Sequence, residues 1–170
     1  MSEGIKLSKN GNDDSDAAIP GFYFSNSVKD VIHTTMGIEP NEIKPFSDGY
    51  DNVDEQITGF LNLTGDLNMM ITLGMSRKTA AAFVVYMTGV QLAEAKDEDM
   101  CDGIAEIINM VAGQIKTQAV GRGYHLKVLT PFVAVGEKCR IVYKSKVENM
   151  TKRFRIGNLD FMLKVFYYHL

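Results

Sequence analysis

Residues 101–120 read CDGIAEIINMVAGQIKTQAV, and the apolar pattern of this stretch decides how the chain is expected to fold. Four β-branched residues recur in it at helical spacing: Ile104, Ile108, Val111 and Ile115. Because each helical residue turns by about 100°, these four lie at about 180–240° from Asp102, on one side of a helix. The pattern therefore predicts an amphipathic helix that packs through that side and ends at Gly121 or Gly123.

The opposite side of this predicted helix carries small and polar residues: Asp102, Glu106, Asn109, Gly113 and Lys116. All five fall within an arc of about 80°, and Asn109 lies about 4.5 Å along the axis from Glu106. A glycine inside a helix is less stable than alanine by roughly 0.5–1 kcal/mol, and close approach of another surface is one reason to tolerate Gly113. An acid and an amide at this spacing are also common on a solvated helix face. The pattern alone thus leaves two interpretations open, a solvated face and a functional stripe.

Further helices and strands are predicted on both sides of this stretch. Residues 21–40 indicate a helix that stops near Gly37, and residues 76–89 a second helix with Ser76 as its N-cap. Residues 57–75 indicate a hairpin that turns at 64–66, and residues 91–99 an acidic connector. The last third is β-rich. Its predicted strands lie within 125–137, near Pro131, and over 139–148, 152–157 and 160–168, with a turn at 157–158.

A weak internal repeat indicates the fold class. SVKDVIHTTMG (27–37) aligns with GIAEIINMVAG (103–113), which sets Asp30 opposite Glu106 and His33 opposite Asn109. A hairpin follows each segment, since GFLNLTGDLNMMITL resembles RFRIGNLDFMLKVF. The prediction is an α/β (α+β) domain of two similar helix-plus-hairpin halves that share one mainly antiparallel sheet, with long helices packed on it. This single domain is expected over 21–170, after a polar N-terminal tail over 1–20.

Composition narrows the function classes. The chain has 170 residues, 45% of them hydrophobic, and a formal net charge of -3 without a basic block, so a nucleic-acid partner is not expected. No apolar stretch reaches the roughly 20 residues of a membrane helix, and the polar start does not resemble a secretory signal. Two cysteines without a CxxC pair favour a reducing compartment, the cytoplasm. Three widely spaced histidines argue against a dedicated metal site.

The polar stripe carries a family resemblance. The order Asp102-x3-Glu106-x2-Asn109, with Pro131 further along, resembles the signature of the CheC/CheX/FliY chemotaxis phosphatases. AEIINMVAGQ is similar to that family's Glu-x-x-Asn-Met-x-x-Gly helix, and VKDVIHTTMGIEP and DFMLKVFYY resemble its first helix and last strand. The resemblance covers roughly residues 22–168. One copy of the motif matches CheX better than CheC, with the Asp30/His33 helix as its degenerate counterpart.

The resemblance implies a CheC-like fold and a phosphatase for the aspartyl phosphate of a CheY-like response-regulator receiver. Asn109 would orient the attacking water, and Glu106 would pair with a lysine of the receiver. Asp102 would support docking or the helix start, and Pro131 would shape the neighbouring loop. The protein would need no cofactor of its own, because the Mg²⁺ belongs to the receiver's site. CheX-type members are dimers, so a homodimer is expected.

A second hypothesis keeps the same partner without catalysis. The helix would dock on a receiver as part of an adaptor or of a flagellar-switch or other signalling complex. An intact Glu106 and Asn109 pair disfavours this reading, because an adaptor has no need of a water-orienting amide. A nucleotide-binding module has little support, since the glycines of GRG (121–123) stand outside a Gly-rich phosphate loop.

Overall fold

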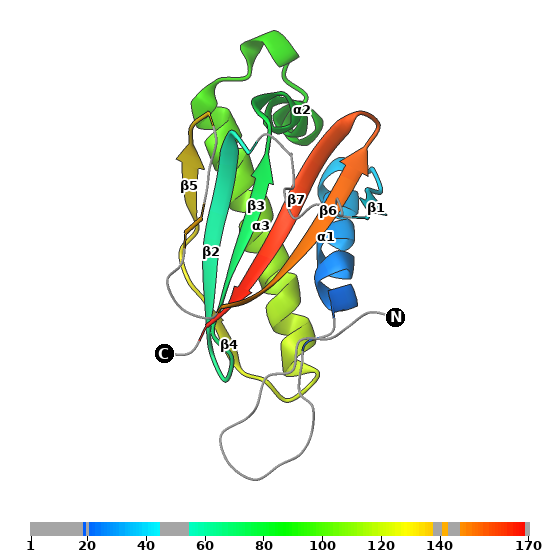
Figure 1. Cartoon of the computed structure of the whole chain (residues 1–170). Coiled ribbons are helices and arrows are strands. Elements are labelled where there is room, and N and C mark those ends of the chain that lie inside the picture. Colours follow the sequence, from blue (N-terminus) through cyan, green and yellow to red (C-terminus); the bar gives the residue numbers. More distant parts are fainter. Residues whose placement is uncertain (1–18, 20, 45–54, 138–140, 143–146, 169–170) are drawn as a thin grey trace.

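The structure is a computed structural model that describes residues 19, 21–44, 55–137, 141–142 and 147–168. The helices of this part are α1 (Gly21–Met36), α2 (Arg77–Thr88), the short 3₁₀ helix η1 (Leu92–Glu94) and α3 (Asp97–Val120). The strands are β1 (Asn41–Ile43), β2 (Ile57–Gly65), β3 (Met69–Met75), β4 (Leu126–Val128), β5 (Phe132–Val135), β6 (Glu148–Ile156) and β7 (Leu159–Tyr167). Figure 1 shows these elements as one sheet with helices behind it.

The sheet joins two hairpins at its centre. Its strand order is β1-β6-β7-β3-β2-β4, with β5 also paired to β2, and every pairing between the described strands is antiparallel. Strands β3 and β7 pair along their length, so the β2–β3 hairpin meets the β6–β7 hairpin there. The predicted pair of helix-plus-hairpin halves that share one antiparallel sheet is therefore confirmed.

Helices α1 and α3 lie side by side on one face of this sheet and run in opposite directions (Figure 1). All four residues of the predicted apolar side of α3 are buried: Ile104, Ile108, Val111 and Ile115. Helix α3 approaches β2 closely at Gly59. A Cβ atom placed on this glycine would lie 3.0 Å from Cγ2 of Ile104 and 3.3 Å from Cγ2 of Ile108. The contact fixes the rotation of α3, and with it the direction of the polar stripe.

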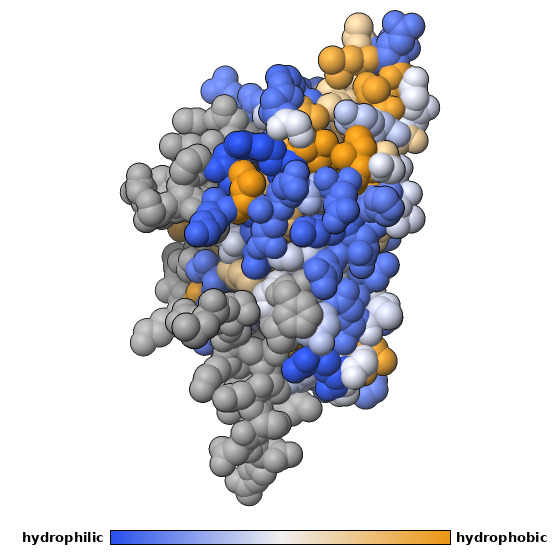
Figure 2. All heavy atoms as spheres, turned by 90° about the vertical axis from the view of Figure 1, so that its right-hand side faces the viewer, coloured by the Kyte–Doolittle hydropathy of each residue, from blue (hydrophilic) through white to orange (hydrophobic). Residues whose placement is uncertain are grey.

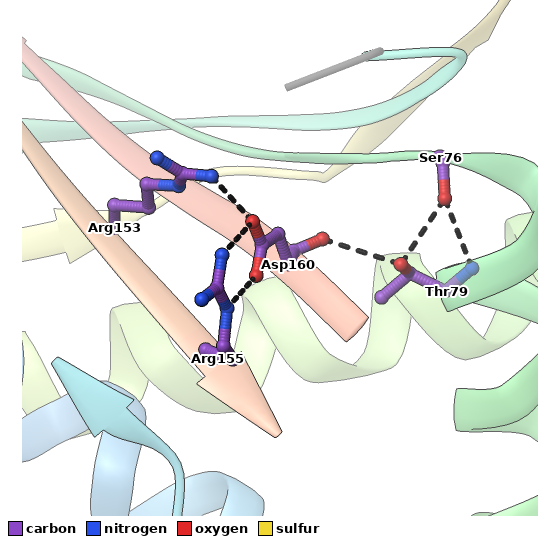
Figure 3. Close-up of polar contacts among 5 residues, drawn as sticks. All are labelled: Ser76, Thr79, Arg153, Arg155 and Asp160. Atoms are coloured by element: carbon purple, nitrogen blue, oxygen red, sulfur yellow. Dashed lines mark hydrogen bonds and ion pairs between the residues drawn. The ribbon is translucent and has the colours of Figure 1, made fainter. Parts of the chain in front are cut away.

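Helix α2 is anchored to the sheet by polar contacts that Figure 3 shows together. Ser76 caps the helix as predicted, since its hydroxyl accepts the Thr79 N–H at 3.2 Å. The Thr79 hydroxyl donates to the backbone carbonyl of Asp160 on β7 at 3.2 Å. The Asp160 carboxylate in turn accepts from Arg153 and from Arg155, whose Nε lies 2.6 Å from Oδ1. This network holds the start of α2 at the end of the β6–β7 hairpin.

Several predicted boundaries are confirmed, and three are wrong. The first hairpin turns at residues 66–68 and not at 64–66, because Thr64 and Gly65 still belong to β2 and pair with β4. Helix α1 ends before Gly37, which has φ +69°, and the last hairpin turns at residues 157–158. The acidic connector predicted over 91–99 is shorter in the structure, because α3 begins at Asp97. Acidic side chains in the first turn of a helix interact favourably with the helix dipole. The strand predicted over 139–148 is absent at residues 141–142, and β6 begins only at Glu148; residues 138–140 and 143–146 lie outside the described part.

The boundary between tail and domain stays a prediction, since residues 1–18 lie outside the described residues. Ile19, which was assigned to the tail, is 2% exposed and belongs to the hydrophobic core with Phe24 and Val28. The core therefore begins at least two residues before α1.

Candidate functional site

The polar stripe of α3 faces solvent. Asp102, Glu106 and Asn109 are all exposed, and none of their side chains makes a hydrogen bond or ion pair with another residue in the described part of the chain. Gly113 is half-buried, and a Cβ atom placed on it would meet no atom within 4 Å. Two carboxylates and an amide thus stand side by side with free hydrogen-bonding groups. They are available to another molecule.

Pro131 and Asn109 line the same open groove of about 670 Å³, although β4 lies between them in the sequence. Strands β4 and β5 pair with successive parts of the same strand, β2, and Pro131 occupies the link between them. Leu129 is the first residue of this link, and its N–H donates to the Asn62 carbonyl at 2.9 Å. Proline suits the link because its φ is fixed and it needs no acceptor for an N–H.

The groove includes residues that the sequence analysis did not single out. Lys127 and Phe132 line it from β4 and β5, and Asn62 lines it from β2. The Phe132 side chain is 67% exposed, which is unusual for a large aromatic residue in a strand. In the sequence, PFVAV has the composition of an ordinary buried strand, so no signal marked Phe132 as a surface residue. Only the pairing of β5 at the end of the sheet exposes this side chain.

Asp102 and Glu106 line a second groove, on the other flank of the stripe. This groove has a volume of about 300 Å³ and lies between α2 and the first half of α3. Val84 and Met87 contribute from α2, and Gly103 from α3. The stripe is therefore a ridge. Its two carboxylates border an apolar groove, and its amide borders the groove that contains Pro131.

Among the residues that the structure describes, the cysteine next to the stripe is not an activated nucleophile. Cys101 precedes Asp102 and is the one cysteine among the described residues. Partial burial raises the pKa of its thiol, and the negative charges of Asp97 and Asp102 raise this pKa further. The thiol therefore stays protonated and unreactive at neutral pH. Within the described residues, no group of three His, Cys, Asp or Glu side chains is placed to hold a metal ion.

The counterpart helix carries its polar residues to the surface as well. Asp30 and His33 of α1 are exposed, as Glu106 and Asn109 are on α3. The two helices thus present related stripes, and only α3 combines a carboxylate with an amide. A carboxylate can accept hydrogen bonds from a cationic donor, and an amide can donate to and accept from a water molecule. Such a surface suits the positioning of a water molecule and the binding of a cation more than covalent catalysis.

The architecture, with its helices on a mainly antiparallel seven-stranded sheet, is the CheC-like fold. The family model described as "Chemotaxis phosphatase CheX" matches residues 57–155, more than half of the chain, and this range contains all four residues of the predicted signature. The chain belongs to the CheX family of chemotaxis phosphatases, and it is accordingly a phosphatase.

Individual relatives agree with this assignment. The "CheY-P phosphatase CheX" of Thermotoga maritima is 27% identical over 115 residues, which make up 68% of this chain and 74% of the relative. The crystal structure of CheX from Desulfovibrio desulfuricans superposes with a TM-score of 0.74 at 22% identity, and covers 86% of this chain and 97% of its own. The CheX–CheY–BeF₃–Mg²⁺ complex from Borrelia burgdorferi matches with a TM-score of 0.71 at 15% identity, over 87% and 97% of the two chains. The likeness to the two structures confirms the CheC-like fold.

None of the helices in the described part of the chain combines the length and the apolar character needed to cross a membrane.

Proposed function

We propose that this phosphatase hydrolyses the aspartyl phosphate of a CheY-like receiver domain. The observation that carries the proposal is the exposed ridge of α3, on which Glu106 and Asn109 stand one turn apart with free side chains. The family and the curated relative from Thermotoga maritima support the choice of substrate, because that relative is a CheY-P phosphatase.

In this proposal, Glu106 anchors the ridge and Asn109 performs the chemistry. The Glu106 carboxylate pairs with the lysine of the receiver's phosphorylation site and sets the register of docking. The Asn109 amide then orients a water for in-line attack on phosphorus, a task that requires positioning more than a nucleophile. A hundredfold acceleration corresponds to about 2.7 kcal/mol, which is within the reach of one oriented water.

The supporting residues of the motif have roles that follow from their positions. Asp102 lies one turn before Glu106 and adds a second negative charge to the docking surface. Pro131 holds the link between β4 and β5 against the groove that contains Asn109, so it shapes the space into which the receiver's loops enter. The Mg²⁺ of the reaction belongs to the receiver, in line with the CheY–BeF₃–Mg²⁺ partner present in the Borrelia complex.

The test is a dephosphorylation assay with the CheY-type receivers of the same genome, each phosphorylated and then mixed with wild type or Asn109→Ala. Wild type should accelerate phosphate loss from at least one receiver, and Asn109→Ala should lose this acceleration while it still binds the receiver. His33→Ala provides the matched control, because His33 holds the corresponding exposed position on α1 and should tolerate the change. Equal rates for wild type and Asn109→Ala would refute the role of Asn109.

The alternative function is a receiver-binding adaptor without turnover. It predicts a stable complex with a receiver charged with beryllofluoride and Mg²⁺, and no effect of wild type on the lifetime of the phosphorylated receiver. The free amide of Asn109 favours the phosphatase, since an adaptor needs no group that orients water.

We also propose that the protein acts in the cytoplasm, with its receiver, and forms a homodimer. Strand β7 is enclosed between β6 and β3, whereas β1 pairs only with Arg153–Arg155 of β6. Among the described strands, the first half of β6 therefore has one unpaired edge, where a second copy can add a strand. Sedimentation of the protein at micromolar concentration should give a dimer, and a monomer would contradict this part of the proposal.

A further inference from the structure

The groove between α2 and α3 is an apolar hollow with an acidic rim. Its apolar lining comes from Val84 and Met87 of α2, from Val90 and from Gly103 of α3. Four exposed carboxylates surround it: Glu94, Asp99, Asp102 and Glu106. Figure 2 shows apolar side chains gathered at the end of the molecule where α2 and η1 lie, and Val90 and Leu92 are exposed there. The groove is thus part of a larger apolar surface.

We propose that this groove is a specificity site for the receiver, and that it takes an apolar side chain flanked by lysine or arginine next to the receiver's phosphorylated aspartate. The inference rests on the proposed function, because Asp102 and Glu106 belong both to the docking ridge and to the rim. A receiver that places its lysine against Glu106 necessarily brings the surface around that lysine over the groove. The site would therefore select among receivers that share the same catalytic residues.

Charge identifies the chemistry of the occupant. Four carboxylates around a small apolar hollow disfavour an acidic segment as the occupant, and they attract a positively charged surface. The Asp99 carboxylate is less available to a partner, because it accepts a hydrogen bond from the Lys96 N–H at 2.9 Å at the start of α3. The carboxylates of Glu94, Asp102 and Glu106 make no hydrogen bond or ion pair with other described residues, so their charges are available to a partner. The volume of about 300 Å³ is at the lower limit of small-molecule pockets, which are roughly 300–1,000 Å³, and it suits one or two side chains.

The isolated protein does not require a glycine at position 103, where the small residue keeps the groove open. A Cβ atom placed on it would lie 3.5 Å from Cγ2 of Val84 and 3.7 Å from Sδ of Met87, both ordinary contacts. An alanine would fit there, and it would stabilise the helix by roughly 0.5–1 kcal/mol. The glycine therefore makes sense as the base of a site that another molecule fills.

The network of Figure 3 anchors α2, which lines this groove with Val84 and Met87. Ser76, Thr79 and Asp160 fix the start of that helix against the β6–β7 hairpin. A groove held open before the partner arrives loses less conformational entropy on binding.

The experiment fills the groove and measures binding and turnover separately. Gly103→Leu places a side chain on the groove floor, and the matched control Gln114→Leu adds the same side chain to an exposed position on the same side of α3, about 16.5 Å further along the axis. Kd is measured with a CheY-type receiver charged with beryllofluoride and Mg²⁺, and kcat and KM with the phosphorylated receiver. We expect Gly103→Leu to raise Kd and KM about tenfold with kcat within twofold of wild type, and Gln114→Leu to match wild type.

A charge series checks the rim without altering the ridge. Glu94→Lys should weaken receiver binding more than Glu94→Gln does, and the difference should shrink at high salt. This comparison of the two Glu94 variants is also the decisive test if Gly103→Leu fails to fold. The proposal is overturned if both Glu94 variants bind as wild type does, if Gly103→Leu leaves Kd unchanged, or if Gln114→Leu weakens binding equally.

Methyl resonances of Met87 identify the occupant. These resonances should shift when the receiver loaded with beryllofluoride and Mg²⁺ is added. Shifts that appear when the protein alone is concentrated would assign the groove to a second copy and refute the proposal. The proposed catalytic function is judged on a different result, the loss of turnover in Asn109→Ala. A phosphatase with normal Asn109 behaviour and an unresponsive groove would refute only the specificity site.

Discussion

Gly113 offers a test in which stability and activity are expected to move in opposite directions. It lies on the polar stripe of α3, one turn after Asn109, and a Cβ atom placed there would meet nothing within 4 Å. Gly113→Ala should therefore fit the isolated protein without strain. Removing a helix-interior glycine should raise the free energy of unfolding by about 0.5–1 kcal/mol. For a chain of this size that corresponds to a rise in Tm of about 1–4 °C.

Receiver binding should weaken in the same variant, because the added methyl group stands on the face that docks. An extra methyl in a closely packed contact is unfavourable by about 1–3 kcal/mol, and 1.4 kcal/mol is a factor of ten in Kd. Urea unfolding gives the stability, and titration with a receiver charged with beryllofluoride and Mg²⁺ gives Kd. Gln114→Ala, the neighbouring exposed position outside the stripe, should leave Kd unchanged.

Two outcomes would refute this reasoning. A lower stability of Gly113→Ala would mean that the methyl group is not free of contacts in the folded protein. An unchanged Kd would mean that no surface approaches Gly113 closely, and the glycine would then need another explanation.

Three further changes test the framework around the site. Gly59→Ala should lower the free energy of unfolding by about 1–3 kcal/mol, because the added Cβ meets the Cγ2 methyl of Ile104. Adding Ile104→Leu, which lacks that methyl, should restore part of the loss. A Gly59→Ala protein as stable as wild type would contradict the close approach. Ser76→Ala should lower the same free energy by about 1 kcal/mol in urea unfolding, whereas Ser76→Gly should lower it by only a few tenths; equal losses would argue against the N-cap bond. Asp160→Asn should destabilise by about 1.5–3 kcal/mol at neutral pH. Hydrogen bonding from Arg155 holds the pKa of Asp160 below its ordinary value, so the stabilisation is present above that ordinary pKa and lost as the pH falls through the lowered one. Unfolding at pH 7 and pH 3 should show the difference between wild type and Asp160→Asn shrinking, and a difference independent of pH would contradict the assignment.

The elements of this protein are largely predictable from local sequence. The apolar residues of α3 recur with the 3.6-residue period of a helix. Helix geometry alone therefore places Ile104 and Glu106 on different sides of α3, before any tertiary contact forms. The N-cap at Ser76 and the helix end at Gly37 depend on hydrogen bonds and dihedral angles within a few residues. These interactions are short in range, which is why their signals are visible in a single chain.

The predictions failed where neighbouring elements compete for the same residues. Asp97 was assigned to a connector, and the structure makes it the first residue of α3, where Arg77 of α2 forms an ion pair with it. The strand predicted over 139–148 was assigned from its apolar and β-branched residues, but β6 starts at Glu148, where pairing with β7 starts. Such boundaries depend on which partner strand or helix is present, and a single segment does not contain that information.

The sequence by itself determined that one helix would carry an acid, an amide and a bare glycine on the side opposite its apolar residues, because helix geometry alone aligns residues three and four apart. The resemblance carried by those residues also indicated the CheX family. Only the tertiary structure placed Pro131 and Asn109 on the same groove, since this arrangement requires β4 and β5 to pair with the same strand. It also placed α2 beside α3 to form the apolar groove. These arrangements join residues that are distant in the chain, and they depend on which faces pack together and not on any local pattern.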